Sequence, residues 1–114
     1  MGIIGIDFLV CVLGAVSMAA NVRHLKYLLG WLIAGTRGGV TRAKIIRVLK
    51  ETPQNANQLA TLLGKDYRTI RHHLDILLKN GIIVSAGDRY GTTYFLSPQL
   101  EAEYVVFEEI VKRI

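Results

Sequence analysis

The chain has 114 residues, with 14 Lys and Arg, 9 Asp and Glu, and one cysteine. This length suits one small domain of roughly 80 residues plus an appendage. The single cysteine, Cys11, excludes a disulfide framework and a CxxC metal site and favours a reducing compartment. Residues 36–97 carry a net charge of +6 and residues 98–114 a net charge of −2. The basic middle favours a polyanion partner, with a merely solvated basic surface as the alternative.

Residues 3–20 form an apolar run with a single charge, Asp7. As a helix this run would span about 27 Å, close to the roughly 30 Å hydrocarbon thickness of a bilayer. Basic residues follow the run and none precedes it, so the positive-inside rule places the C-terminal part in the cytoplasm. We therefore predict a single-pass membrane anchor, with a soluble dimer helix and a cleaved signal peptide as alternatives. The residues expected in its membrane segment include Ile3, Phe8, Leu9, Val10, Leu13 and Val16.

Residues 21–34 place leucines at helical spacing among polar and aromatic residues. Leu25, Leu28, Leu29 and Leu32 form the stripe, and Tyr27 and Trp31 lie close to it in the sequence. This pattern predicts an amphipathic juxtamembrane helix in the membrane interface, which completes a hydrophobic N-terminal segment of residues 1–35. The sequence TRGGV, residues 36–40, predicts a glycine hinge after it.

Residues 41–97 are predicted to form a winged helix-turn-helix domain. We expect a helix over 41–50 and a turn over 52–55. A second helix, over 58–63, is expected to be capped by Asn57 and to bury Leu59, Leu62 and Leu63. A third helix, over 67–80, is expected to be capped by Asp66. Gly64 ends the second helix, and a turn of about three residues before the next is the helix-turn-helix spacing. Two strands, 82–84 and 92–96, flank a charged tip at 87–91 and form the wing.

The helix over 67–80 has a core stripe and a basic face. The stripe consists of Ile70, Leu74, Leu77 and Leu78. The N-terminal end, which in such domains enters the major groove, carries Tyr67, Arg68, Thr69, Arg71 and His72. Arginine pairs with guanine and hydroxyl groups bond phosphate, so we predict DNA contacts from these five residues, from Asn57, and from Arg89 and Tyr90 at the wing tip. A solvated cationic face and an ordinary hairpin tip are the alternatives.

His73 points away from that face, and we predict that it packs near the core and binds no metal. The last predicted helix, residues 98–114, begins with Ser97 as its cap and Pro98 in its first turn. Leu100, Tyr104, Phe107, Val111 and Ile114 recur along it at helical spacing. We predict that this seam is a homodimer contact, with packing on the first helix as the alternative.

The segments NANQLA, DYRTIRHHLDIL and YFLSPQLE carry a family resemblance. With their surroundings, residues 41–110, they resemble the archaeal winged-helix regulators related to the arsenical-resistance repressors (ArsR-type). More narrowly, they resemble a group in which this domain follows a membrane-spanning helix. The resemblance implies that residues 67–72 read bases, that Arg89 belongs to the wing and that the terminal helices dimerise. Metal-sensing members carry cysteine-rich ligand sets, which this sequence lacks, so metal-responsive release from DNA is not implied.

Together these observations predict a mainly α fold with a small β-hairpin wing, preceded by a hydrophobic N-terminal helix. The predicted function is a dimeric DNA-binding transcription regulator, tethered to the cytoplasmic side of the membrane and without a cofactor. No catalytic Ser, His and acid set and no glycine-rich phosphate loop is present in the sequence, so we predict no enzyme. The alternatives are a membrane-associated protein-interaction module, a non-specific architectural DNA-binding protein and, for the location, a soluble cytoplasmic protein.

Overall fold

The computed structural model describes residues 22–88 and 91–114. Its elements are η1 (Gly30–Ala34), α2 (Gly39–Glu51), β1 (Gln54–Asn55), α3 (Ala56–Leu63), α4 (Tyr67–Lys79), β2 (Ile83–Asp88), β3 (Gly91–Leu96), α5 (Pro98–Ala102) and α6 (Tyr104–Val111). Residues 22–29 are helical and lead into η1, a π-helical turn. In these two ranges, no helix has both the length and the apolar character needed to cross a membrane. The predicted anchor, including Ile3, Phe8, Leu9, Val10, Leu13 and Val16, lies outside the described residues.

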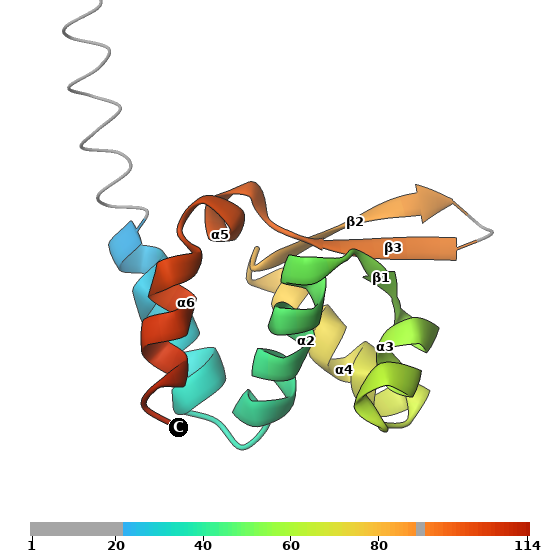
Figure 1. Cartoon of the computed structure of the whole chain (residues 1–114), viewed down its shortest axis with the longest axis horizontal. Coiled ribbons are helices and arrows are strands. Elements are labelled where there is room, and N and C mark those ends of the chain that lie inside the picture. Colours follow the sequence, from blue (N-terminus) through green and yellow to red (C-terminus); the bar gives the residue numbers. More distant parts are fainter. Residues whose placement is uncertain (1–21, 89–90) are drawn as a thin grey trace, which may run out of the picture.

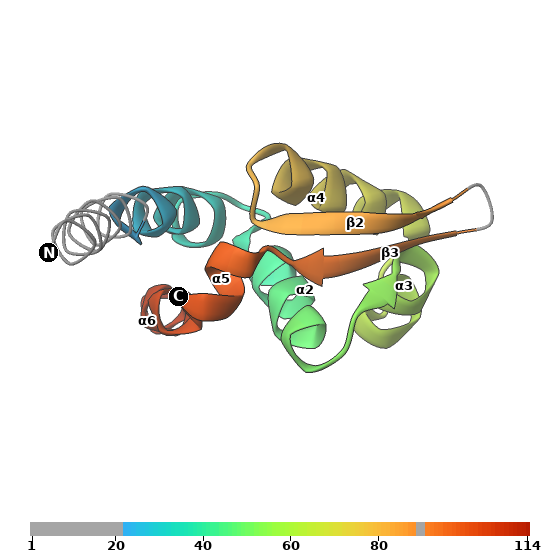
Figure 2. The ribbon, with the colours of Figure 1, turned by 90° about the horizontal axis from the view of Figure 1, so that it is seen from above.

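A three-helix unit and a small antiparallel sheet form the centre of the molecule (Figure 1). α2, α3 and α4 pack together, and the sheet lies against them with the strand order β1-β3-β2. The hairpin of β2 and β3 runs from Ile83 opposite Leu96 to Asp88 opposite Gly91, and it extends past α3 and α4 (Figures 1 and 2). This mainly helical fold with a hairpin wing confirms the fold class predicted for residues 41–97.

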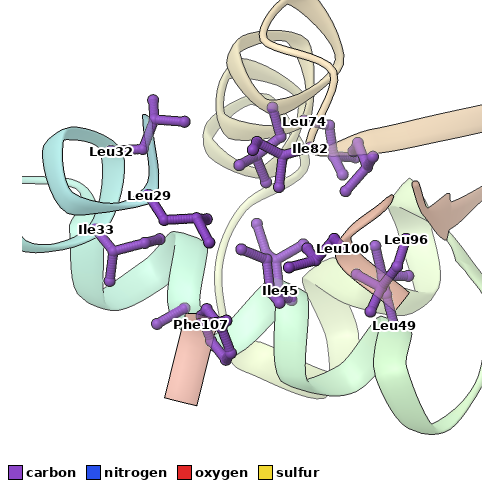
Figure 3. Close-up of a cluster of buried hydrophobic side chains, with 14 of the residues drawn as sticks. Leu29, Leu32, Ile33, Ile45, Leu49, Leu74, Ile82, Leu96, Leu100 and Phe107 are labelled. Atoms are coloured by element: carbon purple, nitrogen blue, oxygen red, sulfur yellow. The ribbon is translucent and has the colours of Figure 1, made fainter. Parts of the chain in front are cut away.

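The hydrophobic core joins both ends of the described chain to the three-helix unit (Figure 3). α6 and the helical residues before α2 lie side by side at the end of the molecule opposite α3 (Figures 1 and 2). The side chains that meet between these parts are less than 4% exposed, except Leu96 at 7%: Leu29, Leu32, Ile33, Ile45, Leu49, Leu74, Ile82, Leu96, Leu100 and Phe107. The N-terminal helix is therefore part of the same folded unit as the winged helix.

The leucine stripe of residues 21–34 faces this core. Helix is confirmed over residues 22–34, but Leu25, Leu29 and Leu32 are 2%, 0% and 0% exposed. The stripe predicted to lie in a membrane interface is therefore already buried in protein, which corrects that part of the prediction. Tyr27 and Trp31, at 76% and 56% exposure, lie on the open side of the helix.

The predicted glycine hinge at 36–40 is partly helix. Gly39 is the buried first residue of α2, and a Cβ atom added to it would lie 1.7 Å from the Ile33 carbonyl oxygen. Because no side chain fits there, the glycine permits a close approach of two backbones. The turn between η1 and α2 is thus held tightly and does not separate two independent parts.

Most of the predicted caps in the helix-turn-helix are confirmed. Gly64 ends α3 with φ 64°, and the Asp66 side chain accepts a hydrogen bond from the Thr69 N–H at 3.2 Å. The cap of α3 is different from the prediction: Asn55 accepts from the Gln58 N–H at 2.7 Å, and the Gln58 side chain accepts from the Asn55 N–H in return. Asn57 therefore lies inside the helix. Leu62, predicted to be buried, is 60% exposed.

The C-terminal segment forms two helices in place of the one predicted over 98–114. Ser97 caps α5 as expected, accepting from the Leu100 N–H at 3.2 Å, and the chain breaks at Glu103 before α6. In the predicted dimer seam, Leu100 and Phe107 are 0% and 1% exposed within one chain. They are core residues, so no partner could contact them, and the seam is reduced to Tyr104, Val111 and Ile114.

Candidate nucleic-acid interface

The N-terminal end of α4 presents an exposed polar and basic surface. Tyr67 is 50% exposed, and Arg68 and His72 are also exposed. Thr69 is half-buried, and its N–H is bound by the Asp66 cap. Hydrogen bonding from the Thr69 side chain, and then from its backbone N–H, lowers the pKa of Asp66, so the carboxylate stays charged at the helix N-terminus, where the helix dipole favours it. The predicted recognition surface is thus held in place by a cap at its first turn.

The opposite side of α4 fixes this surface relative to the rest of the domain. Ile70, Leu74 and Leu77 are fully buried, as their helical spacing predicts. Because these side chains pack inside the three-helix unit, the basic end of α4 stays outside the core.

Arg71 is held by two neighbours. Its Nη1 donates a hydrogen bond to the Tyr94 hydroxyl on β3, and its Nη2 lies 3.5 Å from the Asp75 Oδ1 one turn along α4. Burial raises the pKa of Tyr94, so its hydroxyl stays protonated. Arg71 therefore connects the recognition helix to the sheet, whereas Arg68 forms no side-chain hydrogen bond or ion pair with another described residue.

His73 is buried, as predicted, and belongs to a polar cluster on the inner side of α4. Arg42 is only 7% exposed, and its Nε donates to the His73 Nδ1 at 3.3 Å. Its Nη1 donates to the Leu32 carbonyl at 2.8 Å and to the Thr36 hydroxyl at 2.7 Å. Since Nδ1 accepts, the imidazole is neutral and its proton lies on Nε2. This cluster joins η1, α2 and α4.

The remaining predicted contact residues are Asn57, Arg89 and Tyr90. Asn57 is exposed in the first turn of α3, beside an open hollow of about 420 Å³ that Gln58 and Leu62 also line. Arg89 and Tyr90, predicted at the wing tip, lie outside the described residues. The structure thus brings Tyr67, Arg68 and His72 to one surface.

The roles of Arg42 and Tyr94 were missed by the sequence analysis, although the sequence holds a signal for each. Arg42 stands on the same helical stripe as Ile45 and Leu49, and a charged residue on an apolar stripe indicates a buried polar contact. Tyr94 alternates with Leu96 in a strand, so both side chains face the helices.

The described residues form no metal centre. Between residues 22 and 88 and between 91 and 114, no three His, Cys, Asp or Glu side chains gather closely enough to hold a metal ion. The rings of His72 and His73 are 5.5 Å apart between centroids and inclined at 60°.

The helical core resembles one protein family. Residues 39–85, from α2 into β2, match the model of the family described as bacterial regulatory protein, arsR family. No curated protein sequence matches the chain. The family match covers the helix-turn-helix and the first part of the wing, the same elements that build the basic surface described above.

Solved structures share the fold. A probable transcriptional regulator from Pseudomonas aeruginosa is 25% identical with a TM-score of 0.57, and the match covers 83% of this chain and 77% of that chain. The homodimeric winged helix-turn-helix DNA-binding domain Mb0332 from Mycobacterium bovis, a possible ArsR-family regulator, is 15% identical with a TM-score of 0.60, covering 76% and 78%. Lactococcus lactis ZitR in complex with DNA is 20% identical with a TM-score of 0.53, covering 64% and 50%.

These comparisons define the class of fold: the described chain is a winged helix-turn-helix, and its residues 39–85 are similar to the arsR family. The chain spans about half the length of the ZitR chains that it matches, 53% and 51% for two of them. The family model and the three structures are bacterial, so the comparisons do not support the archaeal origin implied by the sequence resemblance.

Proposed function

We propose that this protein is a homodimeric transcription regulator that binds double-stranded DNA at specific sequences, with α4 as its recognition helix. The observation that carries the proposal is the exposed basic end of α4, which follows a capped tight turn in a winged helix-turn-helix. The net charge of +6 over residues 36–97 supports a nucleic-acid partner. Similarity to ZitR, a protein solved with DNA, supports the same function. The proposal includes no enzymatic activity and no cofactor.

Each exposed residue of this surface has a role in the proposal. Arg68 is fully available to hydrogen-bond a base edge, and His72, one turn further along α4, contacts an adjacent base or phosphate. The hydroxyl of Tyr67 and the backbone N–H groups of Tyr67 and Arg68, which precede the capped N–H of Thr69, bind phosphate. Thr69 and, from α3, Asn57 border these contacts, and Arg89 and Tyr90 supply the contact of the wing.

The dimer in this proposal is formed at the end of the molecule where α6 and the N-terminal helix meet. Exposed apolar side chains lie on α6 and just after it: Val105 and Ile114. A hollow of about 690 Å³ between α2 and α6 is lined by Tyr104 and Val111, among others. Two-fold pairing there leaves both α4 helices free to occupy half-sites about 34 Å apart, one helical turn of DNA.

We infer further that residues 3–20 tether this regulator to the cytoplasmic side of the membrane, as in the archaeal group that the sequence resembles. The support is the apolar run with one charge and the basic residues that follow it. Since Leu25, Leu29 and Leu32 are buried in the core, lipid contact in this proposal falls to the run itself and to Tyr27 and Trp31.

The full-length chain in mild detergent tests the DNA-binding part of this proposal. We expect selection from a random duplex pool to yield a preferred sequence. We also expect the affinity for that duplex to fall with salt at a slope of about −0.9 per neutralised phosphate. Absence of duplex binding would instead favour a protein-interaction module. Binding without sequence preference would favour an architectural protein.

A further inference from the structure

The Tyr94 side chain connects the wing to the recognition helix. Tyr94 lies in β3, the central strand, and pairs with Gln54 of β1 on one side and Ser85 of β2 on the other. Its ring is 1% exposed, so neighbouring strands and the core fix its position. The hydroxyl at the end of this rigid ring accepts a hydrogen bond from Arg71 of α4.

The guanidinium of Arg71 is engaged on two sides. Nη1 donates to Tyr94, and Nη2 lies 3.5 Å from Asp75, leaving the side chain 39% exposed. Bidentate recognition of guanine requires two parallel N–H groups from one edge of the fork. The guanidinium of Arg68 forms no hydrogen bond or ion pair with another described residue, and Arg68 lies closer to the N-terminus of α4. The two arginines are therefore suited to different tasks.

The base of the wing packs on the helices, but its far end does not. β2 packs on α4 and β3 packs on α2, whereas the far part of the hairpin is held by strand pairing and extends past the helices (Figures 1 and 2). The Arg71–Tyr94 hydrogen bond joins the outer side of α4 directly to β3. Simultaneous contact of α4 with the major groove and of the wing with the flanking DNA requires a fixed angle between them.

We propose that Arg71 and Tyr94 are a pair of positioning residues that fix the wing relative to the recognition helix, while base reading falls to Arg68 and His72. This role rests on the proposed DNA-binding function. In this role Tyr94, which is buried and cannot touch DNA, determines how much of the DNA site the protein covers.

Two conservative variants test the pair. Tyr94→Phe keeps the buried ring and removes the acceptor, and Arg71→Met keeps the alkyl chain and removes the donors. Thr52→Val, which removes an exposed hydroxyl just after α2, is the control. Full-length variants in mild detergent are compared for affinity to the preferred duplex, for hydroxyl-radical protection of the DNA flanking that site, and for unfolding in urea.

We expect Tyr94→Phe and Arg71→Met each to weaken binding about tenfold, as for loss of a hydrogen bond to a charged group, and the double variant to lose no more than either. Protection of the flanking DNA is lost in both variants, and the preference for each base is retained. Thr52→Val behaves as the wild type. A double-mutant cycle on urea unfolding shows coupling between the two positions.

The opposite results overturn the proposal. If Arg71→Met relaxes the preference at one base pair while Tyr94→Phe binds normally, Arg71 is a base reader. If both variants unfold earlier but bind with wild-type affinity and footprint while folded, the pair is only structural. A wild-type chain that selects no duplex overturns the proposed function and this role with it, and the unfolding cycle still decides whether the two side chains interact.

Discussion

Three arginines of the domain differ in what surrounds their side chains. Arg68 is exposed at the basic end of α4, Arg71 is bound to Tyr94 and Asp75, and Arg42 is 7% exposed and bound to His73. A guanidinium is always charged, so its partners decide what it can bind. A guanidinium without hydrogen-bond partners remains available for a ligand, whereas one that is already hydrogen-bonded must first break those bonds. Contacts with DNA are therefore expected mainly from Arg68.

Replacing Arg68 with Ala should reduce both affinity and selectivity. Loss of one bidentate base contact costs about 1–3 kcal/mol and relaxes discrimination at that base pair. Fluorescence anisotropy with the preferred duplex and with single-base variants of it measures both effects. Arg113→Ala, an exposed arginine in the acidic C-terminal region, is the control with the same change of charge. Equal losses on all sequences would assign Arg68 to a phosphate contact.

Acid should destabilise the protein through His73. Burial lowers the pKa of His73 below 6.5, and the positive charges of Arg42, His72 and Lys65 act in the same direction. As the pH falls below about 6.5, the unfolded chain therefore takes up a proton before the folded chain does, and the free energy of unfolding decreases. The stabilising contribution of the neutral imidazole is present above that pH and lost below it.

Urea unfolding at several pH values between about 5 and 7.5 measures this loss. In His73→Gln, the amide oxygen still accepts from Arg42 but does not titrate, so the slope of stability against pH should become shallower. His24→Gln, at an exposed position on the N-terminal helix, should keep the wild-type slope. An unchanged slope in His73→Gln would mean that this imidazole is not the group responsible.

At the scale of elements, local signals in the sequence located most helix ends but not all of them. Gly64, Asp66 and Ser97 act within a few residues of their own position, so the sequence was sufficient to predict them. The start of α3 depends on distant residues, because Gln54 and Asn55 pair with Tyr94 and Thr93 of β3. That pairing holds Asn55 in an extended conformation at the entrance to the helix. The Asn55-x-x-Gln58 spacing of a capping box is a local signal for the same start, and the sequence analysis missed it.

The cap of α3 gives a direct prediction with a matched control. Asn55→Ala removes the acceptor of the Gln58 N–H and half of a reciprocal pair, which should cost about 0.5–2 kcal/mol of unfolding free energy. Asn57→Ala lies two residues further, inside the helix and exposed, and should leave stability nearly unchanged. Urea unfolding of the two variants measures the difference. Equal losses, or a larger one at position 57, would contradict the observed cap.

At the scale of the whole molecule, the periodicity of residues 21–34 predicted an amphipathic helix but not what its apolar face meets. Leucines at spacings of three and four suit a membrane interface and a protein core equally well. Two tertiary contacts hold this helix against the core. Gly39 closely approaches Ile33, and Arg42 donates a hydrogen bond to the Leu32 carbonyl. The same holds for Leu100 and Phe107, which are apolar as a contact requires but lie on two separate helices and pack within their own chain.

Two deletions separate the tether from the folded unit. Removing residues 1–21 takes away the apolar run but none of the described core, so the shortened chain should unfold like the full-length one and leave the membrane fraction. Removing residues 1–34 also deletes Leu25, Leu29, Leu32 and Ile33, all at most 2% exposed. Truncating one such side chain costs about 2–5 kcal/mol, and domains of this size are stable by only about 5–15 kcal/mol, so this deletion should abolish cooperative unfolding.

Circular dichroism during heating and fractionation of cell extracts measure the two effects independently. Retention of a cooperative transition after deletion of residues 1–34 would show that the N-terminal helix is dispensable for the core. Recovery of the full-length chain without detergent would remove the tether from the proposed function. In that case Tyr27 and Trp31 would have no lipid to contact, and we would expect them to lie between the two subunits of the dimer. Replacing both with Ala should then shift the chain towards the monomer in sedimentation experiments.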